Sequence, residues 1–370
     1  MIIDCAFYRD GRRQHEGTMP LQEAAASRGP GGFVWLGMFE PGLAELEEVR
    51  AAFGLHELAV EDAQQFHLRP KVEAYEGDVR LLILRTARYD DEREEVDFGE
   101  ISVFVADGFV ITVRQGVASG LHGARARLEQ RPELLKAGGS AVLWAILDQV
   151  IDGYTPVVAE LERDIEQIEE TVFSGAVAPT ERIYFLRREV TNFYRAVHPL
   201  LAVVGGVERG VTARKLLPYF RDVHDHLSLV NEEVSAQRDL LTTVLEANMA
   251  VISVEQTEVG VRQNATIERL TILATIFLPL TFVTGFFGQN FAWLVGSIDG
   301  FPAFLIFGIG GLVVPCVLLY LWLRHNAKQL HASEAGKRAD AAPHRTVHHD
   351  LAHSAAGTPT PVTAEPNPPR

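Results

Sequence analysis

The first 135 residues combine short apolar runs with helical patterns. Apolar runs of strand length, bounded by polar or turn-forming residues, occur at 32–38, 79–87, 101–107 and 109–115. Asp107-Gly108, between the last two runs, is a typical hairpin turn. Apolar positions at helical spacing predict one helix at residues 43–53 and another around 55–64. This part of the chain is therefore predicted to be a mixed α/β domain.

From Ser140 the apolar positions follow a helical period. They recur every three or four residues at Leu143, Leu147, Val150, Tyr154, Val157, Leu161, Ile165, Ile168 and Val172. Gly175 and Pro179 interrupt the pattern, and Thr180 is placed to cap a second helix. The apolar face of that helix is Ile183, Leu186, Val190, Phe193 and Val197. The two helices are predicted to form an antiparallel hairpin.

A third helical pattern begins after Pro218, and the next proline is Pro279. Its apolar positions are Val223, Leu227, Val230, Val234, Leu241, Val244 and Val251. One continuous helix is predicted from about residue 219 to 287, with a length of about 100 Å at ~1.5 Å per residue. Such a helix cannot bury its stripe alone, so the hairpin, copies of the chain, or both should cover it.

Two apolar segments, about 270–287 and 301–323, have the length of membrane spans, because about 20 apolar residues cross a ~30 Å hydrocarbon core. Between Leu270 and Arg324 the only charged side chain is Asp299, which favours membrane spans over buried core helices. The flanking basic residues are Arg262, Arg269, Arg324 and Lys328, and the loop between the segments has none. Both termini are therefore predicted to be cytoplasmic, in a multi-pass protein of the inner or plasma membrane.

The charge of the chain narrows the possible partners. The formal net charge is -15 at pH 7, whereas a nucleic-acid partner would require a basic face. Attraction to cations is compatible with this charge. The sequence shows no nucleophile–base pattern, P-loop or cofactor loop, so neither an enzyme nor an organic cofactor is expected. Residues 324–370 are rich in Pro, Ala and His and are predicted to be a disordered cytoplasmic tail.

The sequence LTILATIFLPLTFVTGFFGQNF (270–291) follows a long charged helix and precedes a second apolar segment. This region resembles the signature of the CorA-type magnesium transporters, the two-transmembrane Gly-x-Asn family. The resemblance extends to LHELAVEDAQQFHLRPKVEAYEGDVRLLILR (55–85) and LPYFRDVHDHL (217–227). The usual middle residue of the Gly-x-Asn motif is Met, and this chain has Gln289 instead.

The resemblance implies a homopentamer with funnel-shaped cytoplasmic domains. The first membrane helices would line a central pore, and the second would face lipid. The expected division is a cytoplasmic α/β domain at 1–135, a helical hairpin at 136–218, a stalk helix at 219–287 that enters the membrane at about 270, an extracytoplasmic loop at 288–300, a second span at 301–323 and the tail at 324–370.

Gly288, Gln289 and Asn290 are the expected selectivity filter. Mg²⁺ loses water reluctantly, so a ring of neutral Asn290 amides suits the hydrated ion, whereas a ring of carboxylates would hold it too tightly. By resemblance, the pore is lined by Asn264, Ile267, Leu270, Ala274, Leu278, Thr281 and Gly285. The two leucines would gate by dewetting, or merely pack helices. Asn264 would form a polar ring, or set the register of a coiled coil.

Two acidic groups are candidate regulatory metal sites, because divalent ions in this family bridge acidic residues of neighbouring cytoplasmic domains and hold the pore shut. The first is Asp90, Asp91 and Glu92, for which a solvated loop is the alternative. The second is Asp222 and Asp225. The tail histidines His344, His348, His349 and His353 could bind a soft transition metal or be merely polar.

The resemblance thus implies a divalent metal cation transporter or channel. Mg²⁺, with Co²⁺ or Ni²⁺, would enter under the membrane potential, and cytoplasmic divalent ions would gate the pore. Mg²⁺ would be both the transported and the regulatory ion. A Zn²⁺ transporter of the same architecture is an alternative, favoured by Gln289 and the His-rich tail. A non-conducting membrane-anchored metal sensor or scaffold is a further alternative.

Overall fold

The computed structural model describes residues 1–29, 31–117, 120–289, 292, 296, 300–311, 313–314, 317–318, 320–322 and 324. The chain divides into two compact units, Met1–Val259 and Gly260–Arg370. Helix α9 (Leu217–Phe287) contributes to both units, and each unit is described by itself.

The first unit is built on a seven-stranded sheet with the order β2-β1-β3-β7-β6-β5-β4. Its strands are β1 (Ile2–Arg9), β2 (Arg12–Arg13), β3 (Gly32–Phe39), β4 (Lys71–Ala74), β5 (Arg80–Asp90), β6 (Glu95–Ala106) and β7 (Phe109–Gly116). All neighbouring strands are antiparallel except β3 and β7, which are parallel. The four predicted strands are confirmed as β3, β5, β6 and β7, whereas β1, β2 and β4 were not predicted.

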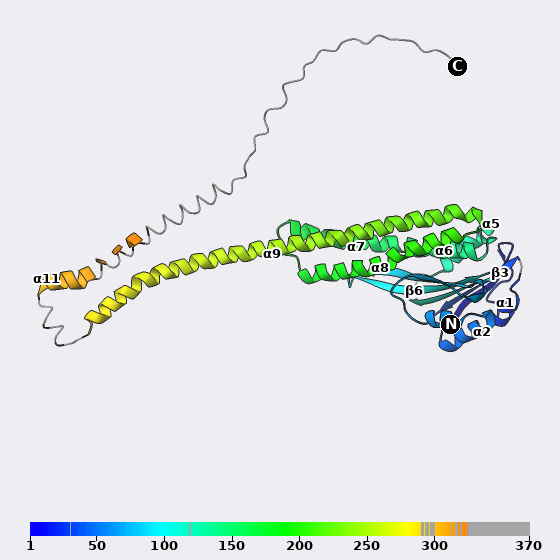
Figure 1. Ribbon diagram of the computed structural model, residues 1–370, viewed down its shortest axis with the longest axis horizontal. Coiled ribbons are helices and arrows are strands. Elements are labelled where there is room, and N and C mark those ends of the chain that lie inside the picture. Colours follow the sequence, from blue (N-terminus) through cyan, green and yellow to red (C-terminus); the bar gives the residue numbers. More distant parts are fainter. Residues whose placement is uncertain are drawn as a thin grey trace, which may run out of the picture. The chain divides into compact units, whose positions relative to one another are not determined.

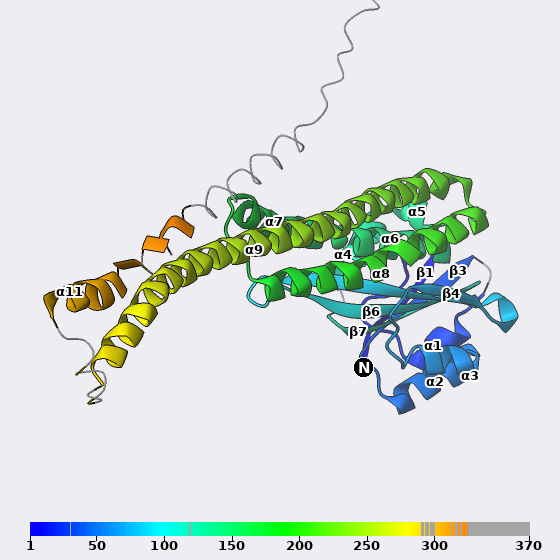
Figure 2. The ribbon, with the colours of Figure 1, turned by 60° about the vertical axis from the view of Figure 1, so that its left-hand side comes forward.

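Helices cover both faces of this sheet (Figure 2). One face is covered by α1 (Leu21–Ala26), α2 (Leu43–Phe53) and α3 (Glu57–Asp62). The other face is covered by α4 (His122–Glu129), α5 (Pro132–Leu135), α6 (Gly139–Asp152), α7 (Tyr154–Phe173), α8 (Thr180–Gly210) and the first part of α9. Short 3-10 helices occur at η1 (Glu76–Asp78) and η2 (Arg214–Leu216). The predicted helix at 43–53 is confirmed as α2, and α3 lies within the one predicted around 55–64.

The long stripe that begins at Leu143 belongs to two helices rather than one. Helix α6 ends at Asp152 and α7 begins at Tyr154, with Gly153 between them. The second helix of the hairpin is α8, but the prediction that Thr180 caps it is wrong. Pro179 is the N-cap residue, and the Thr180 hydroxyl accepts a hydrogen bond from Asn248 of α9 at 3.2 Å. Helices α7, α8 and the first part of α9 lie side by side (Figure 1).

The long helix predicted at 219–287 is confirmed by α9, which has 71 residues. Its predicted apolar stripe is buried in the first unit up to Val244 and packs against the sheet-covering helices. By length and composition, two helical stretches could cross a membrane, Gly139–Phe173 and Arg214–Phe286. The apolar window of the first is 67% buried, and that of the second is 0% buried. Gly139–Phe173 therefore belongs to the buried helical layer that covers the sheet, whereas Arg214–Phe286 contains the predicted membrane span that begins at about residue 270.

Within the second predicted span, the described elements are α11 (Phe301–Ala303) and a π-helical stretch, η3 (Phe304–Gly310). Several residues between 312 and 323 lie outside the described part of the chain. The tail histidines from His344 onward also lie outside it.

Candidate functional site

The predicted pore stripe occupies one side of α9 in the second unit. All seven of its residues, from Asn264 to Gly285, are exposed within the single chain. Leu270 is 61% exposed and Leu278 is 76% exposed. Apolar side chains that recur on one helix face and lack cover within their own chain indicate a contact with other chains or with lipid.

Threonine hydroxyls are hydrogen-bonded along the same part of α9. Thr271 donates to the Ile267 carbonyl at 2.8 Å, Thr281 donates to the Phe277 carbonyl at 2.8 Å, and Thr284 donates to the Leu280 carbonyl at 2.9 Å. Each hydroxyl hydrogen is therefore bonded to a carbonyl of its own helix, and the hydroxyl oxygen can still accept a hydrogen bond. Pro279 lacks an N–H for the carbonyl four residues earlier, so the backbone is locally weakened next to Leu278.

The backbone at the end of α9 explains why residue 288 of the predicted filter is a glycine. The Gly288 N–H donates to the Thr284 carbonyl at 2.9 Å, and a Cβ on Gly288 would lie only 3.0 Å from that oxygen. Gly285, by contrast, lies inside α9, where a Cβ would meet nothing within 4 Å other than the helix's own backbone. Gln289 is exposed. Asn290 lies outside the described residues.

The first acidic group lies on the turn between β5 and β6. Asp90 accepts backbone hydrogen bonds from Glu92 at 3.1 Å and Arg93 at 3.2 Å, and the Arg93 side chain donates to it at 2.9 Å. The Arg93 hydrogen bonds hold the pKa of the Asp90 carboxyl below its ordinary value. Asp90 is therefore largely committed to closing its own turn, while Asp91 and Glu92 are exposed beside it.

Arg93 neutralises part of this acidic turn. Besides Asp90, it forms ion pairs with Glu95 at 3.2 Å and Asp97 at 3.0 Å. Three of the carboxylates in DDEREEVD (90–97) are consequently paired with Arg93 and are less available to a cation. The carboxylates that stay open to a cation are those of Asp91 and Glu92.

The second acidic group lies on the first turns of α9. Asp222 and Asp225 are exposed, and His226 Nε2 lies 3.9 Å from Asp222 Oδ1. Burial raises the pKa of the Asp148 carboxyl in α6, and the negative charges of Asp152 and Asp222 raise it further. Asp222 is thus near the acidic end of α6.

The structure does not bring the two acidic groups together within one chain. The turn around Asp90 lies near the start of α8, which α9 contacts at Asn248. Asn248 lies 26 residues after Asp222 on α9, a separation of about 39 Å at ~1.5 Å per residue. Among the described residues, no group of three or more His, Cys, Asp and Glu side chains is arranged to hold a metal ion.

The family model described as a CorA-like Mg²⁺ transporter protein matches residues 30–325. The chain belongs to this CorA-like family. The cobalt/magnesium transport protein CorA of Thermotoga maritima is 28% identical over 282 residues, covering 74% of this chain and 78% of that protein. The zinc transport protein ZntB of Yersinia pseudotuberculosis is 24% identical over 267 residues, covering 71% and 77%.

The fold is also similar to that of a solved CorA structure. The complete CorA magnesium transporter from Methanocaldococcus jannaschii matches with a TM-score of 0.56 at 18% identity, covering 88% of this chain and 98% of that chain. The CorA family is one of divalent metal transporters, and this chain has both magnesium and zinc transporters among its relatives.

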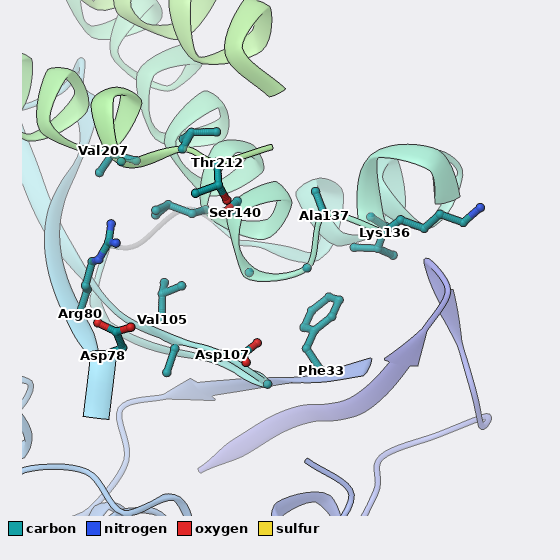
Figure 3. Close-up of a pocket in the computed structure, with 18 of the residues that line it drawn as sticks. Phe33, Asp78, Arg80, Val105, Asp107, Lys136, Ala137, Ser140, Val207 and Thr212 are labelled. Atoms are coloured by element: carbon teal, nitrogen blue, oxygen red, sulfur yellow. The ribbon is translucent and has the colours of Figure 1, made fainter. Parts of the chain in front are cut away.

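This CorA-family chain also contains a cavity of about 760 Å³ that was not predicted from the sequence (Figure 3). It lies between the sheet and the helices that cover it, with Arg80, Asp78 and Asp107 toward the sheet and Ser140 and Thr212 opposite (Figure 3). The lining carries both signs of charge together with apolar side chains. This mixture does not define a class of ligand.

Proposed function

We propose that this CorA-family protein is a homopentameric channel-like transporter that carries Mg²⁺, with Co²⁺ and Ni²⁺, into the cell. The observation that carries the proposal is α9. Its apolar stripe is buried within the first unit up to Val244, and its last part is an exposed apolar helix that ends at Phe287, directly before Gly288 and Gln289. Five such helices around an axis would cover one another and leave the Asn264-to-Gly285 stripe facing the ion.

The proposed layout follows the division at residues 135, 218, 287, 300 and 323, with both termini in the cytoplasm and the second span facing lipid. Gly288, Gln289 and Asn290 would form the filter at the outer mouth. Neutral amide oxygens suit an ion that keeps its water, and the exposed Leu270 and Leu278 would narrow the pore below them.

The membrane potential is sufficient to drive the proposed transport. A divalent ion that crosses 100 mV gains about 4.6 kcal/mol, twice the value for one charge. That free energy supports about three decades of concentration gradient. No ATP-binding site is needed.

Ion uptake into proteoliposomes tests this proposal. With the interior held negative, the purified chain should carry Mg²⁺, Co²⁺ and Ni²⁺ inward, and uptake should fall when the potential is collapsed. Uptake equal to that of empty liposomes for every divalent ion would favour the sensor or scaffold alternative.

Zn²⁺ is the second candidate cargo, because Gln289 replaces the usual Met and a zinc transport protein is among the relatives. We expect Gln289→Met to change the ranking of Mg²⁺, Co²⁺ and Zn²⁺ uptake more than it changes stability, since Gln289 is exposed and makes few packing contacts. Uptake of the three ions should be compared in wild type and variant, with thermal unfolding as the control. An identical ranking would show that the residue 289 side chain does not face the ion.

We further propose that cytoplasmic divalent ions close the channel through Asp91 and Glu92, on the turn that Asp90 closes, and through Asp222 and Asp225. Facing carboxylates repel one another when empty, and a bound Mg²⁺ turns that repulsion into a bridge. Because the two groups lie far apart in one chain, each bridge would join neighbouring chains. The bridged, symmetric pentamer would be the closed state.

Neutralising Asp91, Glu92 and Asp222 together, with the turn-closing Asp90 kept, should weaken the closing effect of internal Mg²⁺. A ligand shifts a conformational equilibrium only by its difference in affinity for the two states, and the variant removes that difference without altering Asn290. Uptake should be measured against internal Mg²⁺ in wild type and variant. Closure at the same Mg²⁺ concentration in both would show that these carboxylates are merely solvated.

A further inference from the structure

A polar network joins the acidic turn to the helices that cover the sheet. Glu94, in the turn between β5 and β6, accepts two hydrogen bonds from Arg182 of α8, from Nε and from Nη2, both at 2.9 Å. Arg182 Nη2 also donates to Gln167 of α7 at 3.0 Å. A two-point guanidinium–carboxylate pair fixes orientation as well as distance.

Two further contacts hold the same turn. The Tyr89 hydroxyl donates to the Asp164 carboxylate of α7. Glu189 of α8 accepts from the Val96 N–H at 3.2 Å, and the Glu189 side chain is buried. The strands on either side of the acidic turn, β5 and β6, are therefore hydrogen-bonded to α7 and α8. A displacement of residues 90–93 requires α7 and α8 to move with the turn, or these hydrogen bonds to break.

Asn248 of α9 is hydrogen-bonded to the residues at the start of α8. Its side chain is fully buried, accepts from the Ala178 N–H at 3.1 Å, and donates to the Ala178 carbonyl at 3.2 Å and to the Thr180 hydroxyl at 3.2 Å. One amide thus pairs both backbone groups of a buried loop residue. Such groups are costly to leave unpaired.

The acidic turn and α9 consequently hold the same short segment, residues 178–182. We propose that this segment links the metal-bound state of the acidic turn to the position of α9. Arg182, at one end of the segment, binds Glu94 of the turn, and Ala178, at the other end, binds Asn248 of α9. Arg182 and Asn248 are positioning residues, since neither touches the ion. The inference rests on the proposed function, because its test by transport requires uptake that is regulated by metal.

Hydrogen exchange tests the link without transport. In the full-length protein, Arg182→Gln should speed exchange of the Ala178 and Thr180 amides and of the amides of α9 around Asn248. The matched control is Arg163→Gln, because Arg163 pairs only with Glu160 on its own helix among the contacts of the described residues. Unchanged exchange in both segments of Arg182→Gln would overturn the link, whatever the protein transports.

A double-mutant cycle tests the regulatory consequence. Arg182→Gln and Asn248→Asp should each raise the internal Mg²⁺ concentration that halves uptake by about 5-fold or more. The double variant should show little further change, because both substitutions break one link. Asn248→Asp keeps the acceptor and the size of the side chain and removes only the donor. Arg182→Lys keeps the charge but cannot form the two-point pair with Glu94, so it replaces Arg182→Gln if that variant does not fold.

The outcomes separate the link from the proposed function. Multiplicative effects of the two substitutions would overturn the link, since independent sites behave in that way. If wild-type uptake ignores internal Mg²⁺ while the exchange result holds, the link stands and the proposed metal regulation fails. If neutralising Asp91 and Glu92 shifts the response but Arg182→Gln does not, the regulation stands and the link fails.

Discussion

Asn290→Ala is expected to reduce divalent-ion uptake to the level of empty liposomes while leaving assembly intact. The amide is the one polar side chain of the proposed filter that the Gly-x-Asn signature retains, and the hydrated ion needs a neutral oxygen ring to replace its outer waters. Alanine removes that oxygen at every position of the ring at once.

Uptake of Mg²⁺, Co²⁺ and Zn²⁺ should be measured in parallel with light scattering of the detergent-solubilised protein. The matched control is Gln256→Ala, which removes an exposed amide of α9 outside the proposed filter and pore stripe and should retain uptake. Wild-type fluxes in Asn290→Ala would exclude this residue as the filter. Loss of the wild-type mass would instead assign Asn290 to assembly.

Glu100→Leu is expected to destabilise the first unit by about 3–5 kcal/mol, because it removes the buried acceptor of the His67 N–H and a negative charge that stabilises the buried Arg85 guanidinium. Glu100 and Arg85 are paired opposite each other on β6 and β5, and both are buried. Glu100 accepts from the His67 N–H at 2.6 Å, and Arg85 donates to the His67 carbonyl at 2.6 Å. The guanidinium also lies 4.6 Å and 4.7 Å from the ring centres of Phe66 and Phe98.

Burial raises the pKa of the Glu100 carboxyl, which His67 and Arg85 act to lower, and burial lowers the pKa of Arg85, which Glu100 acts to raise. The double variant Arg85→Met with Glu100→Leu should therefore recover much of the loss, since it removes both buried charges. Urea unfolding followed by circular dichroism measures both variants. The exposed Glu48→Leu is the control and should change stability by less than about 0.5 kcal/mol. Equal losses in the single and double variants would show that packing, not charge, sets the cost.

The elements predicted well are those with a long, regular pattern. Helix α9 was predicted within two residues at its start, because its stripe continues without proline from Pro218 to Pro279. Strand β1 was missed because Cys5 to Tyr8 are buried on both faces and show no alternation. The polar Asp4 inside β1 is paired with Arg13 and Arg125, and Arg125 is far away in the sequence.

The candidate site was predictable in part. The pore stripe follows from helical spacing together with the family resemblance and stays a prediction, because the residues around it on α9 are exposed as well. The sequence could not reveal that Arg93 engages Asp90, because a run of acidic residues reads as uniformly negative. Nor could it pair Glu94 with Arg182, which lie 88 positions apart and meet only through the fold.

The parallel pairing of β3 with β7 bears on how the chain is made at the ribosome. Strand β3 ends at Phe39 and its partner β7 begins at Phe109. At ~5–20 residues per second, the roughly 70 residues between them take about 4 to 14 s to synthesise. During that time the ribbon of β1 and β3 presents an unpaired apolar edge, a template for pairing with other nascent chains. A chaperone that shields this edge should therefore raise the yield of folded protein more than one that acts after release.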